Sequence, residues 1–213
     1  MSDVDWTKYS SNPPKIDWTQ YTTKPPKGAA PANLEGGSLK GEPLGPHVVR
    51  ALVEVGFSHS GAKAIAAEVG RENDFRPELI FGSHSDPANS EWNGGMLSWQ
   101  KERGKAFVSY MTKQGIMHNG KMQQTYEALV AQSKYLKQEM ASGKFGGGVQ
   151  LVEMLSQPTV DYQEVTKKFG GDYIKWRYND PAYAEHHKRR DKYYQELGGN
   201  LPEVDWSMYR RTK

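Results

Sequence analysis

Glu72 occupies the position in this 213-residue chain that most plainly suggests chemistry. It follows Ala62, Ile65 and Val69 at three- and four-residue spacing, so a helix here places its carboxylate on the apolar stripe. Burying a carboxylate is costly unless it is paired, protonated or lining a cleft. Partial desolvation favours the protonated form, which a general acid for glycoside cleavage needs, and Glu68, one turn earlier, adds like-charge repulsion in the same direction. The spacing predicts a general acid at Glu72; a solvated carboxylate at the helix end is the alternative.

Two short motifs begin at this glutamate and continue along the chain. The first is Glu72 with Phe75 and Pro77, and the second comprises Gly95, Met96, Trp99 and Arg103. In order and spacing they resemble the phage tail lysozymes, in which a helix ends in Glu-Ser-Gly-Phe-x-Pro. A loop or hairpin then carries Gly-hydrophobic-x-Gln-Trp and a following Arg. The resemblance covers residues 43–197 and leaves both ends of the chain unexplained.

The sequence departs from that family pattern at two places. Asn73 and Asp74 replace the usual Ser-Gly, and Ser98 stands where the family commonly has Gln. The second departure concerns substrate contact more than the fold. The resemblance still implies an enzyme that cleaves the β-1,4 bond between N-acetylmuramic acid and N-acetylglucosamine in peptidoglycan. It also implies a lysozyme-like α+β domain.

A second carboxylate decides how the acid is used, and Asp74, Asp86 and Glu91 are the candidates. An inverting enzyme needs a base about 6.5–9.5 Å from the acid, and a retaining enzyme needs a closer nucleophile. We favour Asp86, because in related folds this region lies opposite the acid; its alternative role is that of a turn residue before Pro87. Without a second carboxylate, the enzyme resembles single-acid lytic transglycosylases, in which the sugar's own hydroxyl closes an anhydro ring.

Substrate contacts are expected from residues of the second motif and the helix after it. The expected substrate-binding residues are Gly95, Ser98, Trp99 and Tyr110. Aromatic side chains, including Trp92, can stack on sugar rings, although at such positions they more often form the core or the cleft wall.

No metal or cofactor is expected. His186 and His187 are adjacent, so on a helix they point about 100° apart and do not chelate one ion, and no His-Glu-x-x-His pattern occurs. The basic run from His186 to Arg190 is expected to be a solvated helix face, with contact to anionic wall polymer as the alternative. No phosphate loop, dinucleotide fingerprint or nucleophile elbow is present, and we expect no specific nucleic-acid partner.

Composition narrows the classes of protein further. The chain has no cysteine, which excludes disulfides, zinc-thiolate sites and thiol nucleophiles. Its net charge is +3, and no apolar stretch is long enough to span a membrane. The first residues lack the features of a signal peptide, so we expect delivery by a virion and action in the host periplasm or cell wall.

The chain is expected to form a mainly helical domain with a small β-hairpin or loop region. Residues 1–42 are expected to form a docking arm and linker, 43–198 the lysozyme-like domain, and 199–213 a C-terminal docking peptide. Helices are expected from Pro46 to Gly56, from Ser58 or Ser60 to Glu72, and from Asp180-Pro181 to Gly198. Further helices are expected at 100–115, 121–141, 147–156 and 161–169, with the hairpin or loop at 75–98.

A repeated peptide marks both ends of the chain. Residues 4–15 and 16–27 are two copies of one twelve-residue unit, and 204–209 is a truncated third copy. Each copy places a Trp and a Tyr three residues apart on a single helical turn that is too short to be stable alone. Because these residue types often anchor interfaces, we expect docking to a symmetric tail or portal component of a virion. The anchors are Trp6, Tyr9, Trp18, Tyr21, Trp206 and Tyr209. The alternatives are that the copies fold back on their own domain or are simply Trp-rich tails.

Two functions therefore remain besides a virion-associated lysozyme that opens the wall for genome delivery. One is a lytic transglycosylase of the same superfamily. The other is a structural tail or portal protein whose lysozyme-like domain is inactive or only binds the wall.

Overall fold

Helices form most of the chain that the structure describes. The computed structural model describes residues 38–85 and 92–199, which belong to one compact unit. The helices are α1 (Leu44–Glu54), α2 (His59–Asn73), α3 (Pro77–Ile80), α4 (Lys101–Lys113), α5 (Tyr126–Ala141), α6 (Val149–Ser156), α7 (Tyr162–Lys167) and α8 (Ala184–Glu196). None of the described helices is long and apolar enough to cross a membrane.

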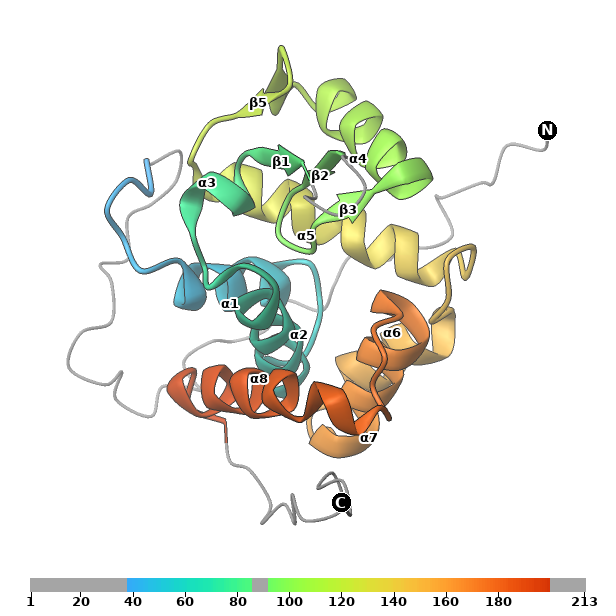
Figure 1. Cartoon of the computed structure of the whole chain (residues 1–213). Coiled ribbons are helices and arrows are strands. Elements are labelled where there is room, and N and C mark those ends of the chain that lie inside the picture. The colour runs from blue at the N-terminus through green and yellow to red at the C-terminus, as the bar shows by residue number, and fades with distance from the viewer. Residues whose placement is uncertain (1–37, 86–91, 200–213) are drawn as a thin grey trace. The chain divides into compact units, whose positions relative to one another are not determined.

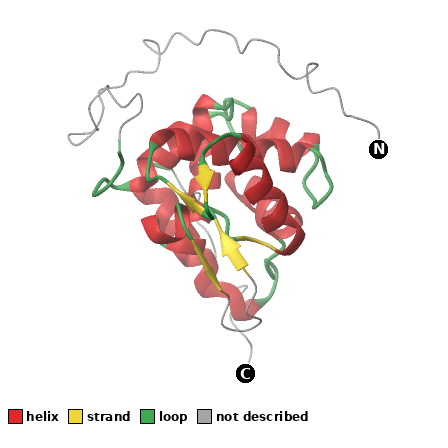
Figure 2. Cartoon of the chain, turned by 90° about the horizontal axis from the view of Figure 1, so that it is seen from above, coloured by secondary structure: helices red, strands yellow, loops and turns green. Residues whose placement is uncertain are grey.

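Two small antiparallel sheets accompany the helices. The first has the order β1 (Ser83–Ser85), β2 (Trp92–Gly94) and β3 (Trp99–Gln100), and the second pairs β4 (Met117–His118) with β5 (Lys121–Met122). In the first sheet Ser83 lies opposite Gly94, and Asn93 lies opposite Gln100. Figure 2 shows the short strands between helices. The expected mainly helical fold with a small β region is confirmed.

Helix α2 is the buried element that carries Glu72. It packs against α1, α6, α7 and α8, and Figure 1 shows α8 running across it. Two glycines permit the close approach of the neighbouring helices. A Cβ at Gly61 would lie 1.9 Å from the carbonyl oxygen of Leu155, and one at Gly70 would lie 2.6 Å from the ring of Tyr193. Close packing around α2 therefore fixes the position of Glu72.

The helix boundaries follow local capping chemistry. The side chain of Ser58 accepts a hydrogen bond of 3.0 Å from the backbone N–H of Gly61, so the expected cap of α2 is Ser58. Asp180 accepts one of 2.9 Å from the N–H of Ala182, as expected for the last helix. That helix opens with a 3-10 turn, η4 (Pro181–Tyr183), before α8 begins.

The helix expected from residue 121 begins only at Tyr126. Asn119 and Gly120, with φ of 51° and 72°, instead form the two-residue turn between β4 and β5. Asn-Gly is the residue pair that such a turn favours, because both central residues need a positive φ. The helix expected at 161–169 also differs, since α7 continues as a π-helical segment, η3 (Lys168–Ile174).

Candidate functional site

A cleft of about 450 Å³ lies beside the end of α2. This volume is within the range of small-molecule sites in proteins. One wall comes from α2, the first sheet and α4, and the other comes from the end of η3 and the residues after it. The cleft is lined by Glu72, His84, Asn93, Leu97, Ser98, Trp99, Gln100, Arg103, Ile174, Lys175 and Trp176.

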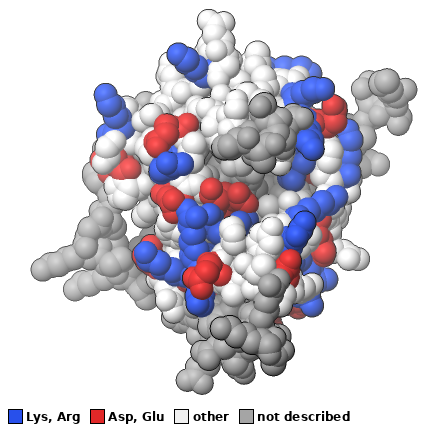
Figure 3. All heavy atoms as spheres, in the orientation of Figure 1, with Lys and Arg blue, Asp and Glu red and all other residues white. Residues whose placement is uncertain are grey.

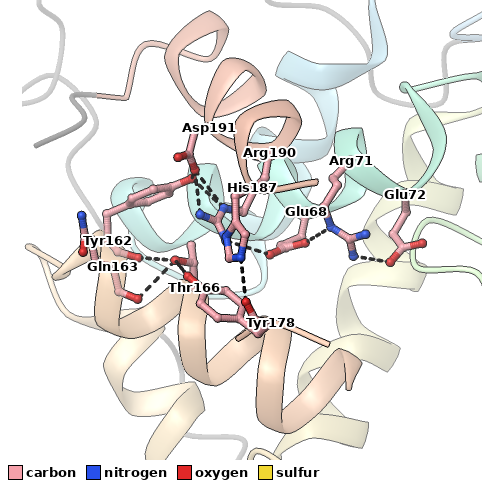
Figure 4. Close-up of polar contacts among 10 residues, drawn as sticks. All are labelled: Glu68, Arg71, Glu72, Tyr162, Gln163, Thr166, Tyr178, His187, Arg190 and Asp191. Atoms are coloured by element: carbon pink, nitrogen blue, oxygen red, sulfur yellow. Dashed lines mark hydrogen bonds and ion pairs between the residues drawn. The ribbon is translucent and has the colours of Figure 1, made fainter. Parts of the chain in front are cut away.

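Glu72 lines the cleft with a side chain that is 22% exposed. Its carboxylate forms a short ion pair with Arg71, whose Nε is also 2.5 Å from Glu68 Oε2 (Figure 4). Burial by itself lowers the pKa of Arg71, but the carboxylates of Glu68 and Glu72 outweigh it and raise that pKa. Arg71 is therefore a fixed positive charge shared between two carboxylates.

A different carboxylate, Glu139 on α5, holds the sheet-side wall in place. It is 3% exposed and accepts hydrogen bonds from the indole of Trp99 at 3.0 Å and from Arg103 at 2.7 and 3.1 Å. The hydroxyls of Tyr135 and Tyr173 also donate to it. Burial, and then the charge of Glu139, raise the pKa of both tyrosines, so both hydroxyls keep their protons as donors.

The structure brings Ser98 and Trp99 to the same cleft as Glu72. Ser98 has a φ of 50°, and its N–H bonds to the carbonyl of Gly95 at 3.0 Å, in the turn before β3. Trp99 is 1% exposed and stacks on Phe107 with ring centroids 4.6 Å apart. Trp99 thus forms part of the wall but has no free face for a sugar ring.

The other two expected substrate-binding residues do not line the cleft. Gly95 is buried with a φ of 74°, and a Cβ there would lie 2.7 Å from Phe107, so its role in the turn explains the glycine. Tyr110 packs beside Tyr135 with ring centroids 5.4 Å apart. Trp92, which was also expected to be able to stack on a sugar, packs over Gly104.

The far wall was not expected from the sequence. Trp176 is half-buried and lines the cleft, and the guanidinium carbon of Arg71 lies 4.6 Å from its ring centroid. Lys175 is exposed and has a φ of 66° at the end of η3. These residues are about a hundred positions from Glu72 in sequence, and only the packing of η3 brings them near. The one sequence signal for this wall was the pair Lys175-Trp176, a cation beside an aromatic residue that can contact a sugar.

The candidates for a second carboxylate divide into two groups. Asp86 and Glu91 lie outside the described residues. Asp74 does not line the cleft; the hydroxyl of Tyr193 donates to it at 2.6 Å, and Arg189 pairs with it. In the described ranges 38–85 and 92–199, Glu72 is the only carboxylate that lines the cleft.

The expectation of a solvated basic face on the last helix is wrong in part. Lys188 is exposed and Arg189 partly so, but His187 and Arg190 are only 1% and 3% exposed. Arg190 turns inward because Glu68 and Asp191 supply negative charge there. Elsewhere on the face drawn in Figure 3, Lys and Arg are interspersed with Asp and Glu.

Two further points concern metal ligands and the terminal repeats. No group of three or more His, Cys, Asp or Glu in the described part of the chain could hold a metal ion. The aromatic anchors of the terminal peptides (Trp6, Tyr9, Trp18, Tyr21, Trp206 and Tyr209) lie outside the described residues.

Comparisons with known proteins add no relative. No family model, curated protein or solved structure matches this chain.

Proposed function

We propose that this protein is a glycoside hydrolase of the lysozyme type, with Glu72 as its general acid. Its substrate is peptidoglycan, and it cleaves the β-1,4 bond between N-acetylmuramic acid and N-acetylglucosamine. The observation that carries the proposal is the position of Glu72. This partly buried carboxylate lies in the last turn of a packed helix and lines a cleft of about 450 Å³ beside a small antiparallel sheet.

The proposed chemistry needs a proton on Glu72 at the moment of bond cleavage. The protonated carboxyl gives this proton to the glycosidic oxygen while positive charge develops on the sugar ring. After transfer the carboxylate is negative, and Arg71, already in contact with it, stabilises that charge. A water molecule then attacks the sugar, and Asp86 remains the proposed residue that activates the water or stabilises the ring charge.

Charge and shape in the cleft support a glycan with acidic substituents. Muramic acid carries a lactyl group and a peptide with carboxylates, and Lys175 is an exposed cation on the cleft lining. Trp176 is half-buried in the far wall, and the exposed part of its ring can contact a sugar. Ser98 offers a hydroxyl in the opposite wall, which suits hydrogen bonding to sugar hydroxyls or acetamido groups.

A lytic transglycosylase is the second candidate, and one observation favours it. No carboxylate other than Glu72 lines the cleft among the residues whose positions are described. In this reaction Glu72 protonates the leaving oxygen, and the muramyl C6 hydroxyl attacks C1 of the same sugar. The hydroxyl proton passes to the Glu72 carboxylate, the glycosidic bond breaks, and a 1,6-anhydro product forms without water.

Digestion of purified sacculi tests the proposal. The full chain should release soluble muropeptides, and their masses separate reducing ends from anhydro ends, which are lighter by one water. Reducing ends support the hydrolase, and anhydro ends support the transglycosylase. An absence of release by folded protein contradicts both and favours a structural protein that only binds the wall.

We also propose that the enzyme reaches the wall as part of a virion, docked through its terminal repeats. The support is the sequence: three copies of an Asp-Trp-x-x-Tyr unit, two near the start and one at 204–209. Deleting residues 1–27 should leave muropeptide release intact and abolish incorporation into particles. Loss of activity in the truncated enzyme, or normal assembly, would contradict docking.

A further inference from the structure

Charged side chains of alternating sign run from the cleft into the helical core (Figure 4). Glu72 pairs with Arg71, and Arg71 pairs with Glu68 at 2.5 Å. Glu68 lies 3.7 Å from Arg190, which pairs with Asp191 at 2.8 Å. We name these five residues, on α2 and α8, the charge chain.

Exposure is concentrated at the cleft end of the charge chain, because even Asp191 at its far end is only 6% exposed. Glu72 is 22% exposed, whereas Arg71 is 5%, Arg190 3% and Glu68 0% exposed. In such surroundings charges interact strongly, because little water screens them. The cleft end is therefore the part of the charge chain that solvent and substrate reach most readily.

The charge chain contains one carboxylate more than its guanidiniums neutralise. Glu68, Glu72 and Asp191 face Arg71 and Arg190, so one negative charge is in excess when every group is ionised. Taking up one proton removes this excess, and like charges near a carboxylate favour its protonated form. Because Glu72 is the member that lines the cleft, it is the site at which that proton can be exchanged and used.

Other charged and titratable groups also face Glu72. His84 on β1, Arg103 on α4 and Lys175 after η3 line the same cleft, and His186 on α8 interacts electrostatically with Glu72 and Arg71. Burial, and then the charge of Arg71, lower the pKa of His186, so its ring is neutral at pH 7. Arg103 is paired with Glu139, which reduces its effect on Glu72. Among the described residues, Arg71 is the charged side chain that forms an ion pair with Glu72.

We infer that Glu68 is a positioning residue for the Glu72 acid. Glu68 shares Arg71 with Glu72, so Glu72 receives only part of the guanidinium's charge, and that guanidinium is held in place beside the acid. Arg190 lies on the other side of Glu68, where its positive charge partly neutralises that carboxylate. This inference rests on the proposed role of Glu72, and its test separates the two.

The test compares the pH profiles of variants that change opposite charges in the charge chain. For a general acid, activity falls on the alkaline side as the acid loses its proton. In Glu68→Gln, Arg71 turns to Glu72 alone, and the alkaline limb should move to lower pH by about one unit. In Arg190→Gln, Glu68 is less neutralised, and the limb should move to higher pH by a smaller amount because Arg190 is farther from Glu72.

Matched controls separate this effect from a change in net charge or in folding. Glu54→Gln makes the same change of charge on α1, at an exposed residue outside the charge chain, and should leave the limb in place. The double variant Glu68→Gln/Arg190→Met removes both partners of a buried ion pair. Proteins tolerate this better than the removal of one partner, because no unpaired charge is left buried. It should move the limb to lower pH, by less than Glu68→Gln does.

A carbon-13 NMR titration of the Glu72 carboxyl gives the same answer without relying on activity. Its midpoint should move in the direction of each variant's alkaline limb. If the parent releases no muropeptides yet these midpoints move as stated, the proposed function fails and the charge chain stands. If activity is present but the limb and midpoint stay in place, or both single variants move in one direction, the inference is overturned. A lower unfolding temperature without such movement also overturns it, since it indicates a purely structural role.

Discussion

Glu139 and Glu72 are carboxylates beside one cleft that differ in how fully they are bonded. Glu139 is 3% exposed and accepts hydrogen bonds from four side chains, Trp99, Arg103, Tyr135 and Tyr173. Glu72 is 22% exposed, and Arg71 is the one side chain paired with it in the described structure. A fully bonded carboxylate holds its neighbours in place, whereas one with free lone pairs at a cleft can exchange a proton. The same residue type is thus suited to architecture in one place and to chemistry in the other.

The largest expected effect on stability comes from Glu139→Gln. The amide cannot accept from all the donors that now converge on Glu139, and Arg103 is left with an uncompensated charge in a partly buried place. The free energy of unfolding should fall by about 3–5 kcal/mol. Denaturant unfolding measures this, with Glu127→Gln as the control because Glu127 is exposed on the same helix. A Glu139→Gln protein as stable as its parent would contradict a structural role.

A smaller effect is expected from Trp176→Ala, which removes the aromatic ring of the far wall. Loss of one stacking surface should raise KM for glycan fragments about tenfold, with less change in kcat. Tyr110→Ala is the comparison, because Tyr110 packs on Tyr135 and does not line the cleft. If Tyr110→Ala raises KM and Trp176→Ala does not, the far wall has been assigned wrongly.

The smallest effect is expected from Asp74→Asn, a carboxylate of the exposed surface. The hydrogen bond from Tyr193, followed by that from Arg189, lowers the pKa of Asp74, although burial opposes the shift. A lowered folded-state pKa stabilises the protein above the unfolded-state value, and this stabilisation is lost as pH falls through the folded-state value. Solvent screens the pair, so about 0.2–1 kcal/mol is expected. Unfolding measured at pH 7 and at an acidic pH should show a larger difference between Asp74→Asn and the parent at pH 7. An equal difference at both values would show that ionisation plays no part.

Local sequence signals were sufficient for much of the fold. Apolar spacing predicted the main helices, and capping residues indicated the start of the last helix at Asp180 and of α2 at Ser58 or Ser60, of which the structure shows Ser58. The Asn119-Gly120 pair is an equally local signal for the second hairpin. The predicted helix nevertheless began at residue 121, within that hairpin. The π-helical segment η3 has no comparable signal, because its wider turns depend on packing against the rest of the domain.

The candidate site was less predictable than the fold. The spacing around Glu72 placed it on a partly buried face, and Ser98 and Trp99 followed from the second motif. Lys175 and Trp176 could not be expected, because residues about a hundred positions away meet Glu72 only through tertiary packing. The basic run on α8 was predicted to be solvated for the same reason. The buried negative charge of Glu68, toward which Arg190 turns inward, lies on another helix.

Replacement of Glu72 by Gln tests the central claim most directly. The amide keeps the shape of the side chain but has no proton to give, and Arg71 keeps its ion pair with Glu68. The rate of muropeptide release from purified sacculi should fall by about 10²–10⁴-fold while thermal unfolding changes little. Glu78→Gln, at an exposed carboxylate of α3, should retain the parent rate. A Glu72→Gln protein that releases muropeptides at the parent rate would contradict the assignment of Glu72 as the catalytic acid.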